Sequence, residues 1–198
     1  KLQPENIIKS ITGKNSIVIK GGKENKSEIS LFYYGSLPDV NDKDNLSFNL
    51  LTDLLQMKAN EKLREEMGST YAPRVSSSIV RPPIGTFNLN LSVSALPDNT
   101  EKIITAFDGL ITDIINNKLS DEDMVKVKSQ KIKSFETMSS TNNYWSSVLE
   151  QQYLYGFDSK NISAYKESVE ATSKDDIVNV AKKYLGSCNI LKAVMNPE

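Results

Sequence analysis

Hydrophobic positions recur along the chain with two different periods, and these periods divide it into strands and helices. The clearest strand covers residues 86–96, where apolar side chains alternate with Thr, Asn and Ser, so one face packs on a core and the other meets water or a partner. Residues 16–20 and 27–34 predict two further strands. The second is apolar on both faces, so we expect it at the centre of a sheet, covered on both sides. Residues 189–195 predict the last strand.

The helical period is strongest over residues 45–67, where leucines recur at a spacing of four in two neighbouring rows. Gly68 follows as a natural helix stop. Residues 69–80 return to a strand pattern, and the short turn after them predicts an antiparallel hairpin with residues 86–96. Shorter helices are expected over residues 100–118, 120–138, 144–155, 161–171 and 174–185.

Polar residues mark the starts of these later helices. Asp98-Asn99-Thr100 is expected to cap the first of them, and the stretches that begin at Ser120 and Ser173 resemble capping boxes with acid in the first turn. In the helix over 144–155, periodicity predicts that apolar side chains face inward. These are Trp145, Val148, Leu149 and either Tyr153 or Leu154.

Strands and helices are mixed along the whole chain, with no Ser/Gly-rich linker between them. This order predicts an α+β fold, a two-layer α/β domain whose mixed, largely antiparallel sheet packs on helices. We expect a single domain over residues 1–198. The chain lacks an initiator Met, so we expect it to have been trimmed, processed or cut from a longer protein.

The amino-acid composition excludes several classes of function for this chain. The 198 residues are 38% hydrophobic and 25% charged with a net charge of −1, which fits a globular domain and gives no electrostatic argument for binding nucleic acid. No stretch approaches 18 apolar residues, so we expect no membrane span. A single cysteine, Cys188, excludes an internal disulfide framework. The compartment stays open between the bacterial periplasm and the cytoplasm.

The absence of histidine is the most informative count. Without histidine this chain has no Ser-His or Cys-His nucleophile pair and no histidine-containing zinc site. The phosphate-binding and dinucleotide-binding glycine motifs are absent as well. If the chain takes part in catalysis, we expect it to do so with supporting groups rather than with a nucleophile or a metal of its own.

One compact polar arrangement stands where the long helix meets the next strand. The run Leu-Arg-Glu-Glu-Met-Gly-Ser-Thr-Tyr covers residues 63–71 and places Arg64 in the last helical turns and Tyr71 just after the helix stop. Arg64 could instead complement the helix dipole or pair with Glu61, and a tyrosine at a strand start is common for packing alone. The residues by themselves leave these alternatives open.

This run and its surroundings resemble the insulinase/pitrilysin family of zinc peptidases. The motif L-R-E-E-x-G-x-x-Y is followed by P-P-x-G-T-F and a strand. Residues 119–128 are similar to the family's acidic cap and lysine-bearing helix, and the ending around Tyr155-Gly156 and residues 173–176 is similar to the family's ending. The resemblance spans nearly the whole chain and rests on the order and spacing of the motifs.

The resemblance implies a metallopeptidase-lobe fold, like that of the mitochondrial processing peptidase, and a divided active site. The family's catalytic domain carries an inverted H-x-x-E-H zinc motif, which a chain without histidine cannot contain. This chain therefore resembles the metal-free C-terminal domain. The resemblance implies that Arg64 and Tyr71 bind a peptide substrate at a zinc ion held by another domain or subunit. It also implies that this chain alone is inactive.

The chemistry of that pair is consistent with peptide hydrolysis. The reaction builds negative charge on the scissile carbonyl oxygen, and a tyrosine hydroxyl and a guanidinium are both hydrogen-bond donors to such an oxygen. Family relatives without catalysis serve as scaffolds, so an inactive structural or interaction module is the alternative. The polar side chains of Asn88, Asn90, Ser92 and Ser94 either line a chamber wall or are solvated. An exposed sheet edge could also accept a peptide as an added strand.

Overall fold

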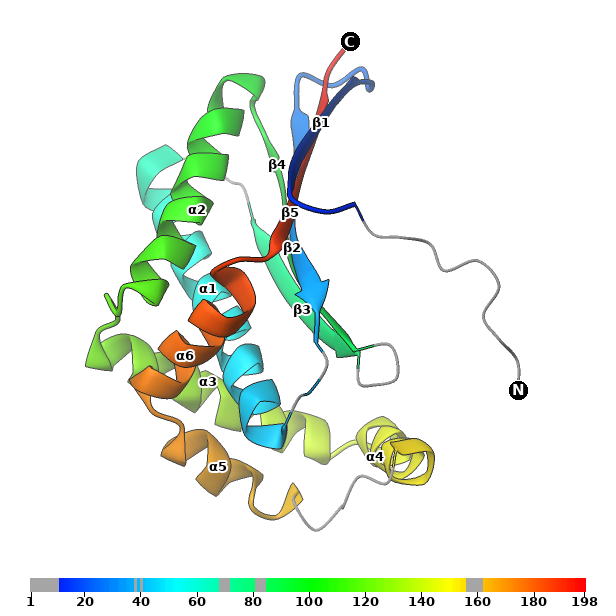
Figure 1. The fold of residues 1–198 in the computed structure, drawn as a ribbon, viewed down its shortest axis with the longest axis vertical. Helices are drawn as coiled ribbons and strands as arrows, with labels where there is room; N and C mark the ends of the chain where they lie inside the picture. Colours follow the sequence, from blue (N-terminus) through cyan, green and yellow to red (C-terminus); the bar gives the residue numbers. More distant parts are fainter. Residues whose placement is uncertain (1–10, 38, 40, 68–71, 81–84, 156–161) are drawn as a thin grey trace.

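The fold has two layers, with a twisted sheet on one side and a layer of helices on the other (Figure 1). The structure is a computed structural model that describes residues 11–37, 39, 41–67, 72–80, 85–155 and 162–198, without the side chains of residues 64–67, 151 and 155. Within these residues, strands and helices follow one another along the chain in the predicted order, with two strands on either side of the long first helix and five α-helices before the last strand. The expected α+β architecture is confirmed.

The sheet has five strands in the order β1-β5-β2-β4-β3. Only β1 and β5 run parallel; the other three neighbouring pairs are antiparallel. The last strand of the chain is therefore inserted beside the first. The strands are β1 (Lys14–Lys20), β2 (Ser27–Ser36), β3 (Arg74–Val80), β4 (Thr86–Ala95) and β5 (Asn189–Asn196).

The helices follow the predicted segments with small shifts at their ends. Helix α5 begins four residues later than the pattern of residues 161–171 predicts, and α1 begins three residues earlier than expected. The elements are α1 (Asp42–Met67), η1 (Pro97–Asn99), α2 (Thr100–Ile115), α3 (Asp121–Ser139), α4 (Asn142–Tyr155), α5 (Tyr165–Ala171) and α6 (Lys174–Leu185).

Side-chain caps explain where several of these helices begin. Asn41 accepts a hydrogen bond from the Asp44 amide at the start of α1 (2.7 Å), and the boxes at Ser120 and Ser173 are both formed. The expected cap at Asp98-Asn99-Thr100 is wrong, because no side chain caps α2. The short 3₁₀ turn η1 leads into this helix instead.

The core lies between α1 and one face of the sheet. Four leucines in two neighbouring rows of α1 are fully buried and belong to one hydrophobic cluster with the inward-facing residues of β2 and β4. Burial of such side chains stabilises the domain. Phe48 of α1, Phe87 of β4 and Tyr184 of α6 form an aromatic cluster with ring centroids 5.1–6.0 Å apart. The leucines are Leu50, Leu51, Leu54 and Leu55.

The opposite face of the sheet carries no helix among the described residues (Figure 1). Strand β2 does lie at the centre of the sheet, as predicted, but its expected cover on both sides is wrong. From Ile29 to Tyr34 its side chains alternate between buried and half-buried positions. We refer to this uncovered side as the open face.

Helix α4 corrects a second expectation. It forms where predicted, yet Trp145, Leu149, Tyr153 and Leu154 are exposed rather than turned inward. Tyr144 makes the edge-on contact with Phe135 of α3 that attaches the helix, and α4 stands apart from the main helical layer (Figure 1). Periodicity identifies an apolar stripe but does not say what the stripe meets.

No helix in the described parts of the chain is long and apolar enough to cross a membrane.

Candidate functional site

The predicted site residues belong to the junction between α1 and β3. Arg64 occupies a position in the last turn of α1, which runs to Met67, but its side chain lies outside the described part of the structure. Tyr71 lies outside the described residues altogether. Their mutual geometry therefore stays a prediction, whereas the elements on either side of them can be examined directly.

Gln56 of α1 holds the entrance of β3. Its amide nitrogen donates to the Pro73 carbonyl (2.8 Å), and its amide oxygen accepts from the Val75 N–H (2.8 Å). A single side chain thus satisfies one backbone acceptor and one backbone donor that no neighbouring strand satisfies at this sheet edge. The start of β3 is fixed to the middle of the long helix.

A second contact fixes the strand further along. The Thr52 hydroxyl lies 2.7 Å from the Ser77 hydroxyl of β3 and also donates to the Phe48 carbonyl within α1. Near the other end of the helix, Ala59 and Leu63 are buried in the core. The helix that carries position 64 and the strand that follows residue 71 are therefore held in one orientation.

The observed start of β3 differs from the predicted one. Strand pairing begins at Arg74, so Ala72 and Pro73 are not part of the strand expected from residue 69. Proline has no N–H to give to a sheet, and the Pro73 carbonyl is already bound by Gln56. Two residues, Ala72 and Pro73, therefore separate position 71 from the first residue of β3.

Neutral polar side chains cover the open face of β3 and β4. We call Ser76, Ser78, Asn88, Asn90 and Ser92 the polar wall. Cross-strand pairing sets Ser76 opposite Asn90 and Ser78 opposite Asn88, and the Asn88 amide donates to the Ser78 hydroxyl (2.7 Å). The predicted alternation of β4 is confirmed, and β3 extends the same surface. Hydroxyl and amide groups both donate and accept, which is the pattern that a peptide backbone offers in return.

Arg74 is the residue that sequence reasoning left without a role. It is exposed at the first position of β3, opposite Ser92, and belongs to the open face at the end of the polar wall nearest to residue 71. The sequence signal was the alternation within β3, which places Arg74, Ser76 and Ser78 on one side. The alternation alone does not say which neighbour this side meets, and the pairing with β4 shows that it continues the polar side of that strand.

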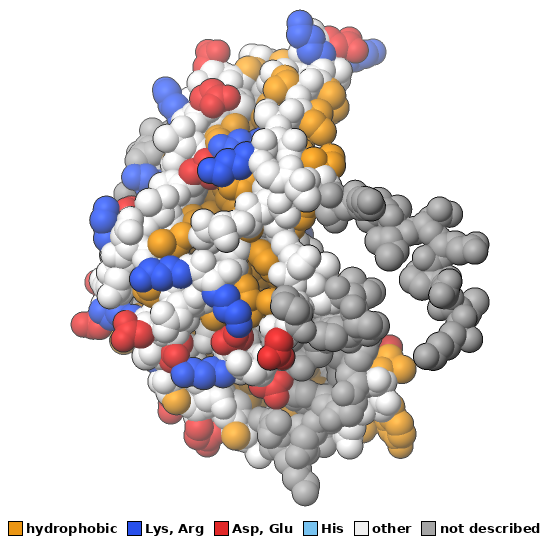
Figure 2. All heavy atoms as spheres, in the orientation of Figure 1, with side chains coloured by type: hydrophobic (Ala, Val, Ile, Leu, Met, Phe, Trp, Pro, Cys, Tyr) orange, Lys and Arg blue, Asp and Glu red, His pale blue; other side chains and the backbone are white. Residues whose placement is uncertain are grey.

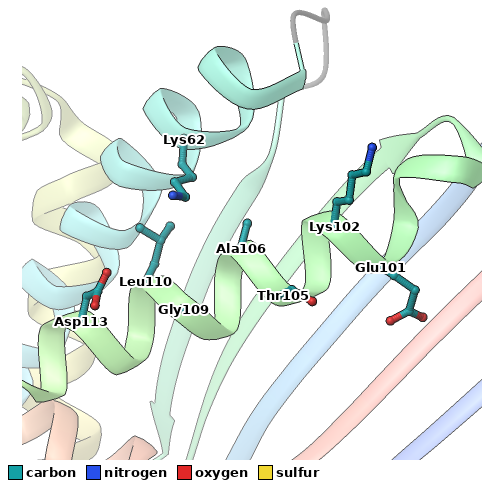
Figure 3. A pocket seen from close by; sticks show the side chains of 8 residues that line it. All are labelled: Lys62, Glu101, Lys102, Thr105, Ala106, Gly109, Leu110 and Asp113. Atoms are coloured by element: carbon teal, nitrogen blue, oxygen red, sulfur yellow. The ribbon is translucent and has the colours of Figure 1, made fainter.

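A shallow groove of about 500 Å³ lies on the helical side, between α1 and α2. Figure 3 shows Lys62 reaching from α1 toward Leu110 of α2, with Ala106 and Gly109 along the same helix. Charges of both signs line it, including Lys102. It lies on the face of the domain away from the polar wall, and we assign it no chemistry.

Buried polar groups elsewhere are structural. The Tyr33 hydroxyl of β2 donates to Asp108 of α2 (2.5 Å), and Asp108 pairs with Lys192 of β5 (2.7 Å). Burial and the neighbouring Asp108 carboxylate raise the pKa of Tyr33 well above its usual range. Burial likewise raises the pKa of the half-buried Cys188 thiol, which makes it a poor nucleophile. The hydrogen bonds among Tyr33, Asp108 and Lys192 link β2, α2 and β5.

At the junction of α1 and α3, Lys58 and Asp123 form an ion pair. Burial opposes ionisation of Asp123, but the hydrogen bonds from Lys58 and Ser120 outweigh it and lower the pKa of this carboxyl. Within the parts of the chain that the structure describes, no three His, Cys, Asp or Glu side chains are grouped so as to hold a metal ion.

Comparison with known proteins places these features in a family. A family model described as the peptidase M16 inactive domain matches residues 3–131. No curated protein matches the sequence. Among solved structures, the fold is similar to part of the periplasmic protease PqqL from Escherichia coli, with a TM-score of 0.79, 14% identity, and coverage of 95% of this chain and 21% of that one.

Two further structures share the fold. A peptidase M16 inactive domain from Pseudomonas fluorescens has a TM-score of 0.75 at 14% identity, covering 98% of this chain and 46% of that one. A protease from Helicobacter pylori has a TM-score of 0.74 at 14% identity, covering 99% and 49%. The present chain therefore spans less than half the length of each of these three proteins.

Proposed function

The chain belongs to the family of the peptidase M16 inactive domain, and from this premise we propose that it is the substrate-binding, metal-free domain of a zinc peptidase. In this proposal the zinc is held by a catalytic domain of the same protein or of a partner subunit, where it supplies the Lewis acid for peptide hydrolysis. The present chain supplies donors to the peptide and hydrolyses nothing alone.

Arg64 and Tyr71 are the donors that we assign to the reacting part of the substrate. The guanidinium stays charged throughout the reaction, and the tyrosine hydroxyl donates at any pH below its own ionisation. Both can hold the scissile carbonyl oxygen, or the carbonyls beside it, as negative charge develops. Preorganised donors of this kind lower the barrier because they need no reorientation during the reaction.

The observation that carries the proposal is the rigid frame on either side of these two residues. Gln56 fixes Pro73 and Val75, and Thr52 fixes Ser77, so helix α1 and strand β3 approach the junction from set directions. A connection tied at both ends loses less entropy when a substrate orders it. This is the property that a pair of positioning donors requires.

The polar wall is the surface that we assign to the rest of the peptide. The five residues of the wall are neutral, and among the described residues charge borders them only at the end nearest to the start of β3, where Arg74 lies and where Ser94 donates to Glu28 (2.6 Å). Neutral hydroxyl and amide groups bind peptide N–H and C=O groups without selecting charged side chains. We therefore expect this domain to favour extended peptides over folded proteins, with little preference for their net charge.

The test uses the parent protein that contains the zinc-binding domain. Arg64→Ala and Tyr71→Phe are each expected to lower kcat/KM by roughly 10²–10³ at unchanged zinc content, which metal analysis measures. Arg64→Lys is the matched control for charge, and should recover only part of the loss because lysine lacks the planar fork. Unchanged turnover in both variants would refute the roles assigned to these residues.

A second measurement concerns the present chain alone. Purified and supplied with zinc, it should cleave no peptide, and peptidase activity retained through purification would refute the placement of the metal in another domain. A parent protein without the H-x-x-E-H motif would instead support the scaffold alternative. These outcomes separate the role of the domain from the roles of Arg64 and Tyr71.

A further inference from the structure

Strand β1 forms one border of the sheet and is exposed along nearly its whole length. It pairs with β5 on one side and has no strand on the other among the described residues. Six of its seven residues are exposed. Natural proteins usually protect such edges, because unpaired strand backbone pairs readily with another chain.

Two hydrogen bonds identify which backbone groups of β1 face outward. The Gly13 carbonyl accepts from the Ile190 N–H (2.9 Å), and the Gly21 N–H donates to the Asn196 carbonyl (2.9 Å). Backbone groups alternate in direction along a strand, so the odd-numbered residues of β1 face β5. The N–H and C=O groups of the even-numbered residues, including Ser16 and Val18, therefore face the free edge.

The side chains of this edge are apolar on both faces of the sheet. Ile17, Val18 and Ile19 are 47%, 62% and 53% exposed, and Figure 2 shows hydrophobic side chains gathered over β1 at this border of the molecule. Register places Val18 beside Val194 on the helical side, and Ile17 and Ile19 on the open face. The opposite border, β3, exposes Arg74, Ser76, Ser78 and Val80, so its exposed side chains are mostly polar.

Positive charge brackets the apolar stretch. Lys14 and Lys20 are the first and last residues of β1, and neither forms an ion pair within the described part of the chain. This charge pattern argues against a second copy as the occupant. Antiparallel pairing of two β1 strands about Ile17 would set Lys14 opposite Lys20 at both ends, and like charges directly opposite each other are unfavourable.

We propose that the free edge of β1 is a docking site for an extended peptide segment of another protein. Its occupant is an added strand with acidic residues at both ends and β-branched apolar residues between them. Backbone hydrogen bonds to Ser16 and Val18 would give affinity, and Lys14 and Lys20 would give charge selectivity. The site goes beyond the function proposed above and does not depend on Arg64 or Tyr71.

The probe is a fluorescent, end-blocked peptide of sequence Glu-Ile-Val-Ile-Thr-Thr-Glu. Paired antiparallel with β1, it sets glutamates opposite both lysines and apolar residues opposite residues 17–19. A second peptide carries lysine in place of both glutamates, and a third carries N-methyl groups on the amides that would face β1. Binding to the 198-residue chain is followed by fluorescence anisotropy.

Two variants make the test specific to this edge. Val18→Pro removes an outward-facing N–H without breaking the ladder to β5, and Val18→Thr is the matched control, with the same shape and the N–H retained. The double variant Lys14→Glu, Lys20→Glu reverses the charge at both ends. Thermal unfolding of each variant is measured, so that a lost fold is not read as a lost site.

The glutamate-ended peptide should bind the wild type roughly tenfold more tightly than the lysine-ended one at low salt, and the difference should shrink in 1 M salt. Val18→Pro and the N-methylated peptide should abolish binding, Val18→Thr should keep it, and the double variant should prefer the lysine-ended peptide. A preference that swaps cannot result from unfolding.

Three results would overturn the proposal. The first is equal binding to Val18→Pro and wild type with both folded. The second is no swap of preference in the double variant. The third is a wild-type dimer that Val18→Pro converts to monomer, which would identify a second copy as the occupant.

Discussion

The Gln56 clamp gives the most direct test of how the junction is held. Gln56→Leu keeps the size of the side chain but removes both hydrogen bonds, to the Pro73 carbonyl and from the Val75 N–H, each 2.8 Å long. Gln56→Glu is the graded variant. Its carboxylate can still accept from Val75 but sets a second acceptor against the Pro73 carbonyl, so it should be less stable than the wild type while it keeps the Val75 bond.

The expected magnitude follows from the two bonds. A typical intramolecular hydrogen bond contributes about 0.5–1.5 kcal/mol, and both of these are partly buried, so Gln56→Leu should lower the free energy of unfolding by about 1–3 kcal/mol. Asn60→Leu is the matched control. This amide lies one turn further along α1, and its side chain forms no hydrogen bond within the described part of the chain, so a change within about 0.5 kcal/mol is expected.

Urea unfolding followed by circular dichroism measures the global effect, and hydrogen exchange measures the local one. The Val75 amide should be protected in the wild type and in Gln56→Glu, and should exchange faster in Gln56→Leu, beyond what the global loss of stability accounts for. Equal protection of Val75 in all three proteins would refute the clamp. So would a leucine variant as stable as the wild type.

Three further predictions concern stability. Tyr33→Phe removes the hydroxyl that donates to Asp108 and should lower the free energy of unfolding by about 1.5–3 kcal/mol at pH 7. Because folding raises the pKa of Tyr33, the extra stability of the wild type is present below about pH 10. Above that pH it should fall by up to about 1.4 kcal/mol per pH unit, as urea titrations measure. The lowered pKa of Asp123 contributes stability above about pH 4 that is lost as pH falls, so Asp123→Asn should be less stable at pH 7 and should lose less of its stability between pH 5 and 2. Leu54→Ala, at a fully buried position, should cost about 2–5 kcal/mol by urea unfolding, and a cost below about 1 kcal/mol would contradict its place in the core.

Several features were determined by the sequence because they depend on neighbouring residues. The alternation over residues 86–95 predicted both the strand and its two faces. Ser120 and Ser173, each followed three residues later by an acid, predicted helix starts that are formed as capping boxes. The absence of histidine excluded the family's zinc motif from this chain without any structure.

Two sequence predictions were wrong at points where two local signals competed. The pattern of residues 69–80 predicted a strand throughout, but Pro73 cannot donate to a ladder, and its carbonyl is bound by a glutamine 17 residues earlier in the chain. Asp98-Asn99-Thr100 has cap-forming residues, yet Pro97 begins a 3₁₀ turn that leads into α2 without a side-chain cap. Propensity ranks the choices at such points, and tertiary contacts select among them.

The tertiary structure alone decided the order of the strands in the sheet, and with it the free edge of β1. Whether β5 pairs beside β1 depends on contacts between residues more than 170 positions apart, and no local pattern encodes that pairing. That one insertion puts β2 at the centre of the sheet and leaves β1 as a free edge. The pairing of β3 with β4, which brings their serines and asparagines together in the polar wall, is instead the hairpin that the sequence predicted. The stripe on α4 shows the same limit, since periodicity defined an apolar face and only packing showed that this chain leaves it exposed.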